Sequence, residues 1–341
     1  MRPLLNASWL LLLTSGCKGC QRDDCVANAE IDCDGVDQDC DGADACEVYA
    51  RRPDTVLYGA LADEGYGAAI AWKSGQLWVG APFDPAGGRL YLEDALVRTG
   101  GPFLGTALLA TDTGVLVGSD GRVEDTAGVE KLTEPIGELE GVGGLLAGEG
   151  ARWVTRTRTG VIWSDGSALD LGGRPDSLAV RDGDLVAGFA FGDTSLIAGS
   201  TRIARTEGAQ DEAGWALVSA DVDGDGVAEW IVGAPAANRV DILDGKTFVW
   251  RASWAPTTGR FGSALATDGT RVFVGAPMAG TDAQGATWVC KGTTESACSM
   301  LDYGDSPQDQ LGFSLLYANG NLYAGAPGGP GSAGSVRVRS P

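Results

Sequence analysis

The sequence predicts an all-β protein made of many short strands joined by tight turns, and three observations lead to this prediction. The 341 residues include 53 glycines spread along the chain, and 44% of the residues are hydrophobic. Glycine tolerates the backbone conformations of tight turns, and this hydrophobic content is too high for a disordered chain. Continuous apolar runs of strand length recur, for example LWV at 77–79 and VFV at 272–274. Finally, similar segments return along the chain, which indicates a repeat architecture.

Four of these segments share one pattern, in which an aromatic residue or Leu stands beside Gly and two apolar strands with a turn between them lead to Gly-Ala-Pro. They are GYGAAIAWKSGQLWVGAP, GWALVSADVDGDGVAEWIVGAP, RFGSALATDGTRVFVGAP and LGFSLLYANGNLYAGAP. Three weaker copies fit the second half of the pattern. The seven copies place one residue each at the glycine of Gly-Ala-Pro, and these marker residues are Gly80, Gly118, Arg156, Gly188, Gly233, Gly275 and Gly325. Intervals between successive markers run from 32 to 50 residues, the length of a propeller blade.

Each copy is followed by a third apolar strand, and most copies also by a fourth. Pairs such as Asp268-Gly269 and Asn319-Gly320 stand between the first two strands, where two-residue hairpin turns require positive φ. The last copy ends without a fourth strand. The segment TVLYGAL at 55–61 precedes the first copy and supplies a candidate for it. We therefore expect the N-terminal strand to complete the last blade and close the ring.

The repeated pattern closely resembles the FG-GAP repeat of integrin α-subunits. The resemblance implies a seven-bladed β-propeller, here over residues 54–341, after a short Cys/Asp-rich N-terminal segment. Such repeats bind calcium in an acidic loop between the first two strands. They also place these loops on the side of the propeller opposite the main ligand face.

The fifth copy contains an acidic string in place of a simple turn. Carboxylates at alternate positions, a backbone carbonyl and a further carboxylate can converge on Ca²⁺, which takes six to eight oxygen ligands. The candidate ligands are Asp221, Asp223, Asp225, the carbonyl of Val227, and Glu229. Integrin-type loops usually have Asp at the last position, so Glu229 departs from the resemblance. A solvated acidic turn without a metal is the alternative, and no other copy has the string.

The N-terminus predicts export. A basic start and an apolar run at 4–13 are typical of a signal peptide and too short to span a bilayer. Thr14, Ser15 and Gly16 before Cys17 resemble a bacterial lipobox, although an aliphatic residue is usual where Thr14 stands. We expect a signal peptide at 1–16, lipidation of Cys17 and location at the cell envelope or outer surface, with membrane contact through this anchor only. An ordinary secretory signal is the alternative.

Residues 17–53 form a Cys/Asp-rich stalk. Its acidic residues are Asp32, Asp34, Asp37, Asp39, Asp41 and Asp44, and they alternate with cysteines and glycines. The string resembles the metal-binding motif of MopE-type bacterial surface proteins, which implies Ca²⁺ here. A disordered spacer, or thiolate binding of a softer metal, are the alternatives. Cysteines in exported chains usually form disulfides, so we expect Cys33 to pair with Cys40 and Cys290 with Cys298; Cys17 lipidation leaves an odd thiol.

The amino-acid composition limits the range of functions that the chain can have. A net charge of −21 opposes nucleic-acid binding, and the absence of His removes Ser-His-Asp and Cys-His catalysis. Carboxylate pairs could hydrolyse glycosides, but none stands in a distinctive motif. We expect a non-catalytic, surface-anchored, calcium-binding module for a protein or glycan partner at a propeller face. An exported polysaccharide-acting enzyme and a structural module of a surface assembly are the alternatives.

Overall fold

A computed structural model describes residues 55–133, 143–192, 194–199, 201–204, 210–329 and 331–341. The chain divides into two units, Met1–Arg51 and Arg52–Pro341, and all described residues belong to the second. The described residues include no helix that is both long and apolar enough to cross a bilayer.

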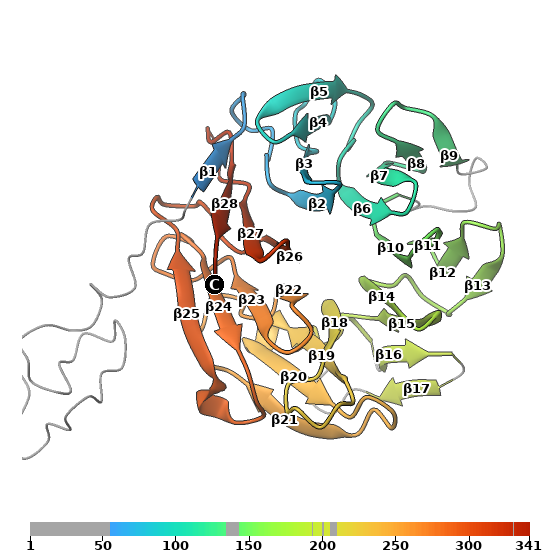
Figure 1. Cartoon of the computed structure of the whole chain (residues 1–341), viewed down its shortest axis with the longest axis vertical. Helices are drawn as coiled ribbons and strands as arrows, with labels where there is room; N and C mark the ends of the chain where they lie inside the picture. Colours follow the sequence, from blue (N-terminus) through green and yellow to red (C-terminus); the bar gives the residue numbers. More distant parts are fainter. Residues whose placement is uncertain (1–54, 134–142, 193, 200, 205–209, 330) are drawn as a thin grey trace, which may run out of the picture. The chain divides into compact units, whose positions relative to one another are not determined.

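The described part forms seven antiparallel sheets, each of four strands, and is a seven-bladed β-propeller (Figure 1). Blade 1 contains β2 (Ala69–Lys73), β3 (Gln76–Ala81), β4 (Arg89–Leu92) and β5 (Ala95–Thr99). Blade 2 contains β6 (Ala107–Thr111), β7 (Gly114–Ser119), β8 (Arg122–Asp125) and β9 (Glu130–Thr133). Blade 3 contains β10 (Leu146–Glu149), β11 (Arg152–Arg156), β12 (Gly160–Trp163) and β13 (Ala168–Asp170).

The second half of the ring repeats this order, with a short 3-10 helix in two blades. Blade 4 contains β14 (Ser177–Arg181), β15 (Asp184–Gly188), β16 (Thr194–Ala198) and β17 (Thr201–Ala204). Blade 5 contains β18 (Ala216–Ala220), β19 (Glu229–Ala234), η1 (Pro235–Ala237), β20 (Arg239–Leu243) and β21 (Trp250–Trp254). Blade 6 contains β22 (Ala264–Thr267), β23 (Val272–Ala276), β24 (Ala286–Cys290), η2 (Glu295–Ala297) and β25 (Cys298–Tyr303). Blade 7 contains β26 (Ser314–Ala318), β27 (Asn321–Ala326), β28 (Ser335–Arg339) and β1 (Thr55–Tyr58).

Blade 7 is completed by the N-terminal strand, as the sequence predicts. β1 pairs antiparallel with β28, from Thr55 opposite Val338 to Tyr58 opposite Ser335. The first strands of successive blades contact one another around the whole ring, from β2 through β26 and back to β2. The closure leaves the ring without a gap between its last and first blades. The seven marker residues of the repeat each lie on the second strand of their blade.

The apolar core lies between adjacent blades. One cluster joins blades 5 and 6 and includes Ile231, Ile242 and Val274, each with no exposed surface. Others join blades 3 and 4, and blades 7 and 1. Because second strands such as β19 are buried on both sides, they contain continuous apolar runs, which in β19 extend from Trp230 to Ala234 after Glu229.

The glycines of the repeat bring neighbouring blades into backbone contact. At six of the seven interfaces an ideal Cβ on the marker glycine would lie 1.8–2.3 Å from the carbonyl oxygen of a glycine in the next blade. The pairs are Gly80 with Gly105, Gly118 with Gly143, Gly188 with Gly214, Gly233 with Gly262, Gly275 with Gly312, and Gly325 with Gly67. The second glycine of each pair has a positive φ, between 80° and 102°. Both glycines are therefore required, one for space and the other for conformation.

Strand direction divides the loops between two faces. Connections after the second and fourth strands lie on one side, which we call the GAP face, and turns after the first and third strands lie on the other, the hairpin face. The acidic string lies between β18 and β19 and therefore on the hairpin face.

We expect Gly275→Ala to destabilise the propeller, because its Cβ would lie 2.0 Å from the Gly312 oxygen, and both atoms belong to packed backbone. Overpacking of this kind typically costs about 1–3 kcal/mol. Thermal unfolding measures the loss. Gly101→Ala is the matched control, because no atom lies within 4 Å of its added Cβ. Equal melting temperatures for both variants would contradict the packing role of the glycine pair.

Candidate metal centre and binding face

The acidic string between β18 and β19 folds into a loop that brings three carboxylates together. Asp221, Asp223 and Asp225 each offer one oxygen, and these oxygens lie within 4.8 Å of one another. Backbone amides fix the loop: Gly224 and Gly226 donate to the two oxygens of Asp221 at 2.7 and 3.0 Å. Both glycines have positive φ, which the tight curl of the chain requires.

The remaining two predicted ligands close the loop. Val227 donates its N–H to Asp225 Oδ1 at 2.7 Å. Glu229 begins β19, has no exposed surface, and accepts the Val222 N–H at 3.2 Å. Glu229 lies outside the cluster of three aspartates. Burial raises its pKa, and the charges of Asp223 and Asp225 add to the effect.

An arginine that the sequence pattern did not reveal faces this loop. Arg251 on β21 places Nη1 2.9 Å from Asp223 Oδ2 and 3.2 Å from Glu229 Oε1. Its Nη2 donates to Asp244, whose pKa is lowered by hydrogen bonds from Thr247 and Lys246 as well as from Arg251. Arg251 is 22 residues beyond Glu229 in the chain, so only the pairing of the third and fourth strands brings it to the loop.

The donor set fits a hard divalent cation. Oxygen ligands from closely spaced carboxylates suit Ca²⁺, and two flexible glycines leave the loop free to adjust its ligand geometry. The buried Glu229 has only the guanidinium of Arg251 as a counter-charge among the described residues. A cation at the loop would therefore take the electrostatic place of Arg251, while Asp244 would retain the arginine.

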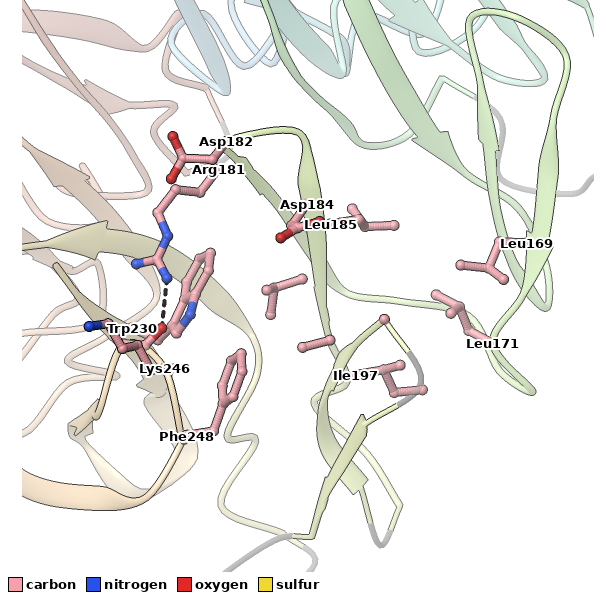
Figure 2. A pocket seen from close by; sticks show the side chains of 14 residues that line it. Leu169, Leu171, Arg181, Asp182, Asp184, Leu185, Ile197, Trp230, Lys246 and Phe248 are labelled. Atoms are coloured by element: carbon pink, nitrogen blue, oxygen red, sulfur yellow. Dashed lines mark hydrogen bonds between the residues drawn. The ribbon is translucent and has the colours of Figure 1, made fainter. Parts of the chain in front are cut away.

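Neighbouring blades hold the loop on both sides. Arg181 of blade 4 donates to the carbonyl of Ala228 at 2.8 Å. It also donates to the carbonyl of Gly245 at 2.7 Å (Figure 2). Its guanidinium lies 4.2 Å above the ring of Trp230, which follows Glu229. On the other side the Asp221 N–H donates to Gly269 O of blade 6 at 2.9 Å.

A cavity of about 470 Å³ lies beside Arg181 at the hairpin end of blade 4. Trp230 and Phe248 form one wall, with their rings stacked 6.1 Å apart, and Asp184 and Leu185 lie across from them (Figure 2). The lining residues include no Cys, Ser or Tyr that could act as a nucleophile beside a base. The cavity offers a stacking surface and scattered charges.

The GAP face carries large apolar side chains in its loops. The exposed ones are Leu61, Phe83, Phe103, Phe191, Trp215, Met278 and Phe313, contributed by the connections of six blades. Phe191 is 61% exposed, and Trp215 lies under the guanidinium of Arg260 at 5.3 Å. Contiguous apolar patches in solvent commonly mark interaction surfaces. The sequence did not single out these residues.

The other predicted site residues divide into two groups. Cys290 and Cys298 are joined by a disulfide across β24 and β25, the bond expected for this pair. Cys17, Cys33, Cys40 and the six stalk aspartates lie outside the described residues.

No family model matches the sequence, and no curated protein matches it. Solved structures match its fold. The WD40 β-propeller domain of Doa1 has a TM-score of 0.57 at 13% identity, over 84% of this chain and 95% of that one. Virginiamycin B lyase from Staphylococcus aureus has a TM-score of 0.59 at 12% identity, over 84% and 98%. A chain of the mitotic checkpoint complex has a TM-score of 0.60 at 12% identity, over 86% and 96%. At these identities the similarity establishes the propeller fold alone.

We expect Arg251→Gln to increase the affinity of the loop for Ca²⁺, because it removes a positive charge within 3.2 Å of two candidate ligands. The gain should be about tenfold, or ~1.4 kcal/mol. In chelator the same variant should melt at a lower temperature than the wild type, because Glu229 loses its counter-charge.

Isothermal titration calorimetry and thermal melts check both parts. Arg122→Gln, the same change of charge on the GAP face, is the control. It should alter neither the Ca²⁺ affinity nor the melting temperature in chelator. Equal Ca²⁺ affinity in the wild type and Arg251→Gln would show that the arginine does not compete for the loop.

Proposed function

We propose that this chain is an exported, calcium-stabilised propeller of the FG-GAP type that binds a protein partner through its GAP face and catalyses no reaction. The propeller fold is compatible with a binding module. The observation that carries the proposal is the presence of seven exposed large apolar side chains in GAP-face loops. A protein partner suits such side chains better than a glycan does, because burial of apolar surface drives most protein association.

The buried carboxylates support a non-catalytic role. Glu64 accepts hydrogen bonds from the Tyr91 hydroxyl and from the N–H groups of Ala60 and Leu61, and it anchors the connection between β1 and β2. The others are paired with arginines: Glu124 with Arg98, Glu229 with Arg251, Asp241 with Arg239, and Asp302 with Arg337. Each has a structural partner, whereas a glycosidase needs two carboxyl groups that face one substrate bond.

Calcium supports this function through stability. The acidic loop lies on the hairpin face, away from the GAP-face loops, and contacts blades 4 and 6 through Arg181 and Gly269. A bound ion would hold β18, β19 and these neighbours in one arrangement without touching the partner.

We expect chelation to lower the melting temperature of the wild type. A ligand present at a hundredfold its Kd stabilises the folded state by about 2.7 kcal/mol. For a domain of this size each kcal/mol corresponds to a shift of roughly 2–4 °C. The double variant Asp223→Ala with Asp225→Ala should show no difference between calcium and chelator. Asp165→Ala with Asp170→Ala, the same loss of charge in blade 3, should keep it. A wild-type melt that does not respond to chelator would refute the site.

Binding at the GAP face is tested by capture of envelope proteins on the immobilised chain. Phe191→Asp with Trp215→Asp should abolish capture of a specific partner, whereas Val129→Asp with Val249→Asp on the hairpin face should not. Retention of a glycan alone would move the partner class to carbohydrate. Turnover in a hydrolysis and lyase screen that is lost with one carboxylate, without loss of fold, would instead establish an enzyme.

The N-terminal segment completes the proposal. We propose that residues 1–16 direct export, that Cys17 is acylated, and that the MopE-type stalk at 17–53 carries the propeller at 54–341 away from the envelope surface. Two or more acyl chains give stable membrane anchoring. We expect Cys17→Ala to move the protein from the membrane fraction to the soluble exported fraction. Mass spectrometry that finds no acyl group on wild-type Cys17 would exclude the anchor.

A further inference from the structure

The interface between blades 3 and 4 is the one that lacks the glycine pair. Arg156 stands at the marker position of blade 3. The second glycine of a pair stands two residues before the residue that pairs with the marker of its own blade. In blade 2 this is Gly105, two residues before Ala107, which pairs with Gly118. The equivalent residue of blade 4 is Pro175, two residues before Ser177, which pairs with Gly188. Both members of the pair are therefore replaced, and a long cationic side chain occupies a position where the other blades have none.

The chain makes room for this guanidinium. A Cβ on Gly144 would lie 2.6 Å from Arg156 Nη2, so a larger residue there would displace the guanidinium. Arg156 is largely buried, and its Nε is inaccessible to solvent and donates to no acceptor among the described residues. A buried donor without an acceptor costs free energy, and more so when it is charged. The site is thus built around a hydrogen-bonding group that the described residues do not satisfy.

The positive charge of a second arginine acts on the first. Burial lowers the pKa of Arg156 to about 10, and the positive charge of Arg174 contributes to the shift. Arg174 is exposed in the connection between β13 and β14, on the GAP face. The neighbouring carboxylate, Asp176, accepts the Ala190 N–H at 2.9 Å. Among the described residues neither arginine has an ion pair.

Three arginines at the GAP ends of other blades are paired. Arg89 lies 2.6 Å from Asp84, Arg239 lies 2.7 Å from Asp241, and Arg260 pairs with Glu212. The chain has 46 acidic and 25 basic residues, so acidic side chains outnumber the basic ones that they could pair with. Arg156 and Arg174 have no ion pair among the described residues, and the same is true of Arg122 and Arg158 on this face.

We propose that Arg156 and Arg174 form an anion site that takes a carboxylate of the protein partner. A guanidinium donates two parallel hydrogen bonds to a planar carboxylate, which selects this group over a spherical ion. Phe191 follows Ala190, whose N–H holds Asp176, so an exposed aromatic ring lies near the site. The partner segment is accordingly an acidic residue beside an apolar one. This inference rests on the proposed binding at the GAP face.

The experiment follows the arginine Nε–H resonances of the full chain by NMR while acetate replaces chloride at constant ionic strength. We expect a saturable shift of the Arg156 signal, with a Kd on the order of millimolar for so small a ligand. Arg174→Gln should weaken it at least several-fold. Arg152→Gln, at the opposite end of β11, should leave it unchanged. The blocked dipeptide N-acetyl-Glu-Leu-amide should bind more tightly than acetate. Glucuronate should bind no more tightly than acetate.

Three results would overturn the proposal. One is an Arg156 signal that does not respond to acetate. Another is tighter binding of glucuronate than of the dipeptide. The third is an acetate response that appears only after Glu138→Gln and Glu140→Gln, which would assign the arginine to a carboxylate of its own chain. Loss of partner capture in the Phe191→Asp and Trp215→Asp variant without any acetate response would reject this site alone. An acetate response with unaffected capture would reject the proposed function.

Discussion

The approach of neighbouring blades to backbone contact is the constraint on which the rest of the structure depends. At six interfaces the Cα of one glycine faces the carbonyl of another, and no side chain fits between them. This contact fixes the spacing of the first and second strands near the axis. The apolar residues between the blades then pack at a distance that those contacts have set. The recurrence of glycine at these positions of the repeat is thus a packing requirement repeated around a ring.

The fold could be predicted from the sequence because its determinants are local. One blade is coded within about 40 residues, so self-similarity reveals the number of blades and the strand that each marker occupies. Closure by β1 was also predictable, because the last copy lacks a strand and an unmatched strand stands before the first. The cystine between Cys290 and Cys298 followed from their short separation.

The sites were only partly predictable, because their remaining members come from other strands or blades. Spacing indicated Asp221, Asp223 and Asp225, but Arg251 reaches the loop from β21 and Arg181 from blade 4. Glu229 fits the string by position. In the structure it is buried, accepts a hydrogen bond from Val222 and pairs with Arg251. Arg156 was visible as a departure from the marker pattern. Its meaning required the position of Gly144 and the absence of a partner for its Nε among the described residues.

The two faces of the propeller therefore have different roles in this account. The hairpin face holds charged groups that are tied to one another, with Arg251 and Arg181 fixing the acidic loop from two sides. The GAP face holds exposed apolar rings, and its Arg156 and Arg174 have no ion pair among the described residues. Because the ion and the partner would lie on opposite faces, we expect calcium to influence binding through the stability of the blades and not through contact.

Hydrogen exchange of the full chain, read by mass spectrometry with and without calcium, tests this separation most directly. We expect calcium to slow exchange in the loop at 221–229, in β18 and β19, and in the turn after Arg181. The GAP-face loops around Phe103 and Phe191 should exchange at the same rate in both conditions. Unchanged exchange at 221–229, or slowing that is strongest in the GAP-face loops, would contradict the account.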